Sequence, residues 1–373
     1  MSSSLTTATP SAITRETALL SLLRAVPDPR HRRGVRHELA VLLTVGLAAV
    51  LAGSRSFAAI GEWSVALPPA AMSRLGVKGL APSESTIRRA FTRVDAAALD
   101  AVLGAWMWTR TTVVAGRRVI AVDGKTVRGA KTKTRSVPHL LAVLDHAEGT
   151  VLGQLAVAAK SNEIPAARTL LAMFDLVNAV VTLDAMHTQH DTARAIVAAG
   201  GDYVLTVKGN QPSLRTALKK LPWTDVPAHT SVQVGHGRRA RRTIRVLTCP
   251  DWVDFPGATQ VAQLRRTTTT RHKTTVDVVY LITSADRMAA PPATLASWVR
   301  NHWGIENRLH WVRDVTFDED RSQVRTGHAP QVMATLRNLA ISLLRLAGWT
   351  GIATALRHHA QDPQRPLTLL LTC

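Results

Sequence analysis

The chain has 373 residues, of which 46 % are hydrophobic, so a wholly disordered protein is excluded and two or three domains are expected. It carries 46 Lys and Arg against 26 Asp and Glu, a formal net charge of +20. This excess favours nucleic acid as a partner, then an anionic membrane surface, with a merely solvated basic surface as the plain alternative. The two cysteines form no CxxC pair, so neither a zinc site nor a disulfide framework is expected in what we interpret as a cytoplasmic protein.

The first third of the sequence is predicted to be helical. Residues 1–15 are rich in Ser and Thr and are expected to be a disordered tail that resembles no signal peptide. Residues 16–112 are expected to form a helical domain for DNA binding, beginning with a helix over 14–24 that Thr14 caps. The apolar stretch 39–52 is too short to span a bilayer, so it predicts a buried helix and no membrane partner.

The segment 85–94 predicts an amphipathic helix that Ser83 or Ser85 caps. Its arginines, Arg88, Arg89 and Arg93, lie on about one face. Such a face suits a DNA groove and an ordinary solvent-exposed helix equally well.

An α/β pattern is predicted from residue 113 to residue 350. Strands are expected over 117–127, 139–146, 150–159, 179–186 and 202–210, the first of them entering a turn at its Asp-Gly pair. Helices are expected over 162–176, capped by Ser161 or Asn162, and over 188–200, capped by Thr188. This order predicts a mixed α/β sheet whose first three strands meander.

A basic, β-rich insertion is predicted over about 222–290, before the last helical segment. Residues 201–290 hold 14 Lys and Arg against six Asp and Glu, and the sequence GRRARR at 237–242 is the densest cluster. A long helix is expected from Thr294 to about Val315 and another over 332–349, and residues 351–373 are expected to be a C-terminal tail.

Three acids stand out by their placement. Asp123 and Asp184 end apolar strands, and Glu306 lies in a helix rich in Trp and His. Converging carboxylates bind hard divalent cations, and two such ions can activate the attacking hydroxyl and stabilise the leaving oxygen of a phosphodiester displacement. Each acid taken alone also has a plainer interpretation, as a turn residue, as a helix start, or as a partner of Arg308 or His310.

Five segments of the chain resemble the motifs of ISAs-type insertion-sequence transposases, which belong to the DDE superfamily: VDGKTVRGA (122–130), KSNEIPAA (160–167), TLDAMHTQ (182–189), GGDYVLTVKGNQP (200–212) and the stretch from HWGIEN to DVTFDED (302–320). GSRSFAAIGEW (53–63) is similar to the helical domain associated with that family. The resemblance covers about residues 20–350.

The resemblance implies an RNase H-like catalytic core in which Asp123, Asp184 and Glu306 are the catalytic residues and hold two Mg²⁺ ions, with Mn²⁺ able to substitute. It implies cleavage at the ends of a mobile element and transfer of the freed 3′-hydroxyl into target DNA. The expected partners are double-stranded terminal inverted repeats and target DNA, bound by a homodimer that associates with the bacterial nucleoid.

The chain departs from the family pattern at several positions. Around the glutamate, Val299 and His302 stand at the family's Tyr and Arg positions, and Arg313 stands at its Lys position, with Arg300 close enough to take part of the Arg role. In the insertion, Ala240 replaces the acid of an HGRxE motif, which removes either a phosphate-orienting contact or a dispensable exposed salt bridge. These departures keep two rivals open, a metal-dependent DNA nuclease without strand transfer and an inactive or repurposed DNA-binding protein.

The candidate DNA-binding residues are basic or aromatic: Lys125, Arg128, Lys208, Arg238, Arg242, Arg300, His302, Trp303 and Arg313. Trp303 suits stacking on a displaced base, against the alternative that Trp298, Trp303 and Trp311 all pack in the core. His187 suits either a phosphate contact or a structural role.

Overall fold

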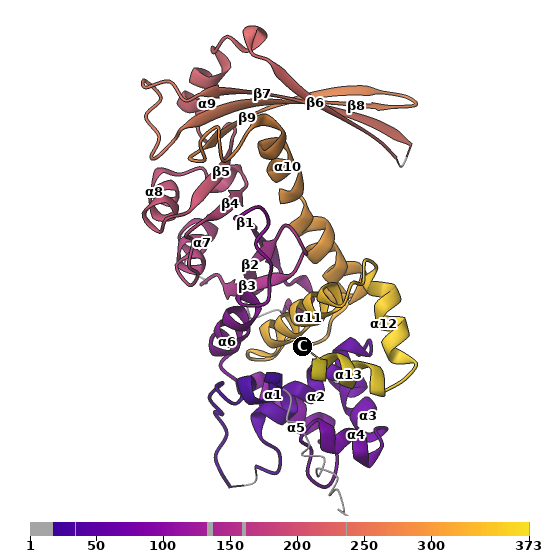
Figure 1. Cartoon of the computed structure of the whole chain (residues 1–373). Coiled ribbons are helices and arrows are strands. Elements are labelled where there is room, and N and C mark those ends of the chain that lie inside the picture. Colours follow the sequence, from indigo (N-terminus) through magenta and orange to yellow (C-terminus); the bar gives the residue numbers. More distant parts are fainter. Residues whose placement is uncertain (1–17, 34, 133–136, 159–161, 236, 373) are drawn as a thin grey trace, which may run out of the picture.

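Figure 1 shows the computed structural model of the chain, which describes residues 18–33, 35–132, 137–158, 162–235 and 237–372. The predicted tail 1–15, the Thr14 cap, the candidate cap Ser161 and His236 of the insertion motif lie outside the described residues.

The N-terminal third consists of helices that pack on one another. They are α1 (Ala18–Leu23), α2 (Leu39–Leu51), α3 (Phe57–Val65), α4 (Pro69–Arg74), α5 (Glu84–Arg93) and α6 (Ala96–Trp108). All 13 residues of α2 are buried, which confirms the predicted buried helix. Across the described ranges, no helix combines the length and apolarity needed to cross a membrane.

The amphipathic helix α5 begins after Ser83, whose hydroxyl oxygen accepts a hydrogen bond from the Thr86 N–H. It buries its apolar face, including Phe91, which contacts Phe57 of α3 edge to face. Its arginines remain exposed.

A nine-stranded sheet in the order β3-β2-β1-β4-β5-β9-β8-β7-β6 forms the centre of the molecule. Its first part contains β1 (Arg118–Thr126), β2 (His139–Asp145), β3 (Val151–Ala156), β4 (Ala179–Leu183) and β5 (Asp202–Val207). β1, β2 and β3 form an antiparallel meander, whereas β1, β4 and β5 are parallel neighbours. The helices α7 (Glu163–Leu171) and α8 (His190–Ala198) connect β3 to β4 and β4 to β5, so the predicted mixed sheet is confirmed.

Two local predictions in this part are wrong. β1 does not turn at its Asp-Gly pair but continues to Thr126, because the extra residues pair with β2 as far as His139. Thr188 does not cap α8, because its hydroxyl donates a hydrogen bond to the Thr206 carbonyl at 2.6 Å.

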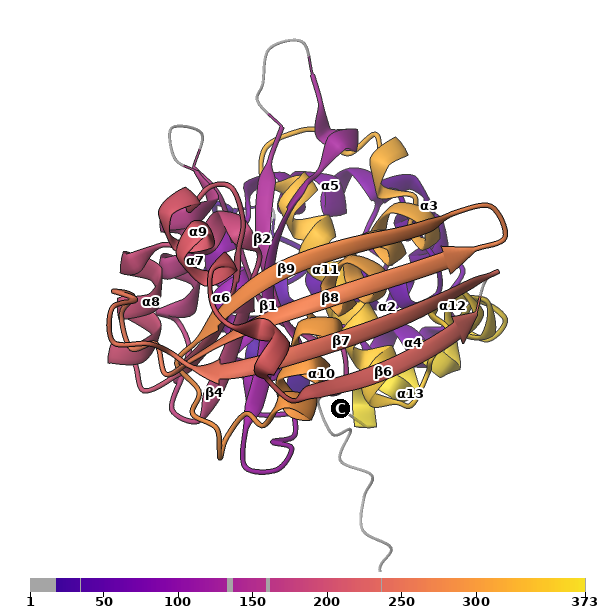
Figure 2. The same cartoon turned by 90° about the horizontal axis from the view of Figure 1, so that it is seen from above.

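The predicted insertion extends the same sheet. After α9 (Pro212–Lys219) come β6 (Ala228–Gly235), β7 (Arg238–Thr248), β8 (Gln260–Thr270) and β9 (Thr274–Thr283), and β9 pairs antiparallel with β5. Figure 1 shows these four strands above α10 (Pro292–His302), which contacts β6 and β7. Seen from above in Figure 2, these four long strands form a twisted part of the sheet that crosses the width of the molecule.

The C-terminal part differs from the prediction in two respects. The helix expected from Thr294 to Val315 is α-helical only through His302, and two π-helical segments, Glu306–His310 and Val312–Thr316, continue it. The expected tail is helical, because α12 (Ile352–Ala360) and α13 (Gln364–Thr372) follow α11 (Ala329–Leu346) and pack on α2. α11 also contacts β3 and α6, so the helices and the sheet share one hydrophobic core.

A buried triad of charged side chains connects the second π-helical segment, Val312–Thr316, to α11. The Glu319 carboxylate lies 2.7 Å from Nη2 of Arg313 and 2.9 Å from Nη1 of Arg337, and all three side chains are at most 1 % exposed. Burial alone would raise the pKa of Glu319, but the two arginine charges overcome that effect and hold the pKa at about 2. The prediction that Arg313 binds DNA is therefore wrong, because no phosphate can reach it.

Glu319→Gln should lower the free energy of unfolding by about 3–5 kcal/mol at pH 7, because it leaves buried arginine charge without its counter-ion. The pKa of Glu319 is lowered in the folded state, so this stabilisation is complete above the ordinary value of 4.5 and is lost as the pH falls towards 2. Urea unfolding at several pH values measures the difference. The exposed control Glu62→Gln should change stability by less than about 0.5 kcal/mol, and equal stability of the two variants at pH 7 would contradict the role of the triad.

Candidate active site at the β1–β4 edge

Two of the three predicted acids emerge side by side from parallel strands. The register of β1 and β4 places Val122 opposite Leu183, so Asp123 and Asp184 each follow the last paired residue. Because parallel neighbours run in the same direction, both residues lie towards the same edge of the sheet, where the charge of Asp184 acts on Asp123.

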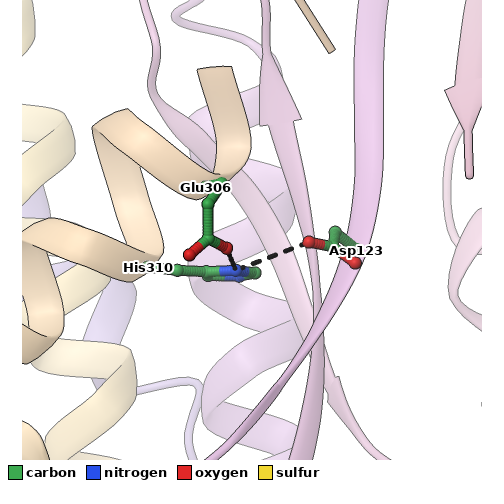
Figure 3. A group of neighbouring side chains, drawn as sticks. All are labelled: Asp123, Glu306 and His310. Atoms are coloured by element: carbon green, nitrogen blue, oxygen red, sulfur yellow. Dashed lines mark hydrogen bonds and ion pairs between the residues drawn. The ribbon is translucent and has the colours of Figure 1, made fainter. Parts of the chain in front are cut away.

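The third acid, Glu306, reaches the same edge from the first π-helical segment, Glu306–His310. In Figure 3, Glu306 and His310 lie on one face of this segment and point towards Asp123. Nδ1 of His310 is 3.1 Å from Oε2 of Glu306 and 3.5 Å from Oδ2 of Asp123. The structure therefore brings Glu306 to Asp123 and adds His310, which the sequence suggested only as a partner of Glu306. π-helical insertions of this kind are frequent at functional sites.

Asp184 is close enough to influence Asp123 but has a contact of its own. Its Oδ1 accepts a hydrogen bond from the Met186 N–H at 3.0 Å and caps the short helix Ala185–His187. The plain interpretation of Asp184 as a helix start is thus correct. Its charge still raises the pKa of Asp123.

The electrostatics of the site favour a bound cation. Burial raises the pKa of Asp123, and the negative charges of Asp184 and Glu163 raise it further against the opposing effect of His310. The hydrogen bond with His310 lowers the pKa of Glu306. Crowded carboxylates of this kind are stabilised when a cation joins them.

The side chains present fit a divalent ion. One ligand atom each from Asp123, Glu306 and His310 lies within 4.8 Å of the others. Carboxylate oxygens are the ligands that Mg²⁺ and Mn²⁺ prefer, and both ions complete their shells with water or phosphate oxygens.

A fourth carboxylate, Glu163, was missed as a site residue by sequence reasoning. It starts α7 after the Asn162 cap, and its Oε1 lies 2.6 Å from Nε2 of His139. A Cβ on Gly124 would come within 2.7 Å of Glu163 and 2.5 Å of His139, so the glycine after Asp123 lets these two side chains approach β1 closely and does not form a turn. The signal was an acid in the first turn of a helix that follows the meander.

His187 and His302 are held by contacts within the protein. His187 is 1 % exposed and lies 3.7 Å from Glu163, so the alternative of a phosphate contact is wrong for it. Nδ1 of His302 is 3.0 Å from the Thr182 hydroxyl, and burial lowers the pKa of His302 to about 4. The prediction that His302 binds DNA is wrong, because a neutral and largely covered imidazole cannot pair with a phosphate charge.

The remaining DNA-binding candidates fall into two groups. Lys125 is 8 % exposed and pairs with Asp314 at 2.5 Å, so it supports the strand that carries Asp123 and is not free to meet DNA, contrary to the prediction. Arg128, Lys208, Arg238, Arg300 and Trp303 are exposed. The alternative that places Trp303 and Trp311 in the core is wrong, since they are 60 % and 54 % exposed, whereas Trp298 is buried.

The insertion and α10 form a shared basic surface. Arg242 and Arg300 both donate to the side-chain oxygen of Gln233, and burial together with the charges of Arg300, Arg266 and Arg238 lowers the pKa of Arg242. Ala240 lies between Arg238 and Arg242 on the same face of β7 and is 6 % exposed. An acid at position 240 would therefore be covered, which corrects the interpretation of an exposed salt bridge.

Lys125→Gln should lower the free energy of unfolding by about 1–3 kcal/mol, because it leaves Asp314 without its partner. The salt dependence of binding to a non-specific duplex should stay unchanged. The matched variant Arg238→Gln should do the opposite, reducing the slope of log K against log salt by about 0.9 with stability unchanged. A reduced slope for Lys125→Gln at unchanged stability would show that Lys125 contacts DNA after all.

Two known protein families match the chain, one over the sheet and one over the N-terminal helices. The family described as "Transposase DDE domain" matches residues 115–343, and the family described as "DDE_Tnp_1-associated" matches residues 20–107. The first range contains the sheet, α10 and most of α11, and ends before α12 and α13. The second range contains the N-terminal helices.

Relatives of similar length carry related names. "Putative transposase YncI" of Escherichia coli O157:H7 is 31 % identical over 88 % of this chain and 87 % of its own length. "H repeat-associated putative transposase YhhI" of Escherichia coli strain K12 is 31 % identical over 87 % of this chain and 90 % of its own length. The mixed sheet is thereby confirmed as RNase H-like. The chain belongs to the DDE transposase family of insertion-sequence type.

Proposed function

We propose that this protein cuts DNA at the ends of its own mobile element and joins the freed 3′-hydroxyl groups to target DNA. The observation that carries the proposal is the meeting of Asp123 and Glu306, from a strand and a π-helical segment far apart in sequence, beside Asp184. A cluster of carboxylates in a protein of net charge +20 suits a reaction on a polyanion whose approach the rest of the surface favours.

Asp123, Asp184 and Glu306 would hold two Mg²⁺ ions, for which Mn²⁺ could substitute. When bound, such ions activate the attacking hydroxyl and stabilise the leaving oxygen of a phosphodiester displacement. The chain itself supplies orientation. β1 positions Asp123, the Met186 N–H fixes Asp184, and His310 directs Glu306 towards Asp123. Rigid placement of this kind lowers the cost of reaching the transition state.

The DNA partners would be the terminal inverted repeats and the target duplex. Arg128, Lys208, Arg238, Arg242 and Arg300 would contact the backbone, since basic side chains supply sequence-independent affinity for phosphate. The N-terminal helices and the basic insertion would recognise the ends. Synapsis of two ends requires two active sites, so the working complex would be a homodimer.

The acids are tested by Asp123→Asn, Asp184→Asn and Glu306→Gln, assayed with Mg²⁺ on DNA that carries the element's ends. Each variant should lose cleavage by on the order of 10²–10³-fold or more, because each removes charge from the reaction centre. Each should still bind the same DNA in EDTA. Glu62→Gln, exposed and outside the site, serves as the control and should cut normally.

The products separate the rivals. Cleaved ends that also appear joined to target DNA support transposition. Cleavage without joining would favour the nuclease, a rival that the substituted Val299 keeps open because its side chain packs in an apolar cluster and offers no polar group. Binding without cleavage by the wild type would favour a repurposed DNA-binding protein.

A further inference from the structure

A cavity lies beside the chain segment that carries Glu306. It has a volume of about 720 Å³ and lies where three parts of the chain meet, namely the residues after α2, the π-helical segments, and the α11–α12 connection with α12 itself. Asn307, next to Glu306, and Trp311, one residue after His310, are in its lining. The cavity is in the range of sites for small molecules and single nucleotides.

The cavity is strongly basic. Arg55, Arg345 and Arg357 line it, and no Asp or Glu is among its lining residues. Within the described ranges none of these arginines forms an ion pair with a carboxylate. Nε of Arg345 is buried without a hydrogen-bond partner there, although its Nη1 donates to the Thr350 carbonyl at 2.9 Å. Unpaired arginines around a cavity favour an anion with several acceptor oxygens.

The N-terminus of α12 adds backbone donors to the same cavity. Gly351, Ile352 and Ala353 line it, and Gly351 starts this nine-residue helix without a side-chain cap. The first N–H groups of a helix are free to bind phosphate when no side chain caps them.

The lining also includes exposed apolar side chains. Trp311 and Val315 are 54 % and 56 % exposed; Trp311 lies between the two π-helical segments, and Val315 belongs to the second. A large apolar ring that stays in solvent beside three arginines is an arrangement suited to stacking on a base while the charges hold its phosphate.

We propose that this cavity binds one unpaired nucleotide of the DNA, with its base on Trp311 and its phosphate near Arg345, Arg357 and the N-terminus of α12. Within a duplex, neighbouring bases cover both faces of a base, so a nucleotide that stacks on Trp311 must lie outside the duplex stack. The inference rests on the proposed function in taking DNA as the ligand. It adds a strand-binding site distinct from the carboxylates and from the basic surface of the insertion.

The affinity test uses a fluorescent 15-nucleotide oligothymidine and, in parallel, a blunt duplex, both in EDTA. Trp311→Ala should weaken oligothymidine binding by about 5–150-fold, the equivalent of one lost base stack, and leave duplex binding unchanged. Trp311→Phe should retain most of the affinity, and Arg357→Gln should reduce the salt slope for the single strand by about 0.7. Trp252→Ala, which removes another exposed tryptophan, should change neither.

Photocrosslinking locates the contact directly. An oligothymidine carrying one 5-iodouracil should crosslink to the peptide that contains Trp311, and Trp311→Ala should lose that crosslink while keeping its thermal melting curve. Wild-type affinity of Trp311→Ala together with crosslinks only elsewhere would overturn the proposal. So would an equal loss of single-strand and duplex binding, or a change of oligomeric mass without loss of oligothymidine binding. Neither measurement needs metal or cleavage, so failure of the transposition assay leaves this result interpretable.

Discussion

The parallel pairing of β1 with β4 is the constraint on which the candidate site depends. Its register sets Val122 opposite Leu183, and this alone brings Asp123 and Asp184 to one edge of the sheet. Two carboxylates so placed repel each other, and the raised pKa of Asp123 records that cost together with the larger cost of burial. The cost is sustained because β4 is buried on both faces, so a slip by one residue would exchange its two faces and disrupt the packing on each.

Glu306 is held by a different device. The triad of Arg313, Glu319 and Arg337 connects the π-helical part of the chain to α11. Lys125 adds a link from β1 to Asp314 on the same segment. Lys125, Arg313 and Arg337 are therefore buried, where they help to position Glu306 and do not contact DNA. Exposed cations lie on α5, on the insertion and on α10, and further arginines line the Trp311 cavity.

The sequence was sufficient for the order of the strands and the buried α2, because apolar periodicity is a local signal. The three acids were selected by the family resemblance, and their catalytic role stays a prediction. The sequence was insufficient where partners come from distant segments. Lys125 and Arg313 looked like DNA contacts because nothing local reveals Asp314 and Glu319 as their partners in space. Residues 351–373 looked like a tail because the surface of α2 that covers their helices lies some 300 residues earlier in the chain.

The central claim is that Asp123, Asp184 and Glu306 together hold divalent metal. Crystals of the protein grown with Mn²⁺ test it most directly, because anomalous scattering locates the ion without any assay of activity. The account predicts a peak bounded by these three carboxylates and its loss in Asp123→Asn. Manganese found only elsewhere on the protein, or a peak that persists unchanged in that variant, would contradict it.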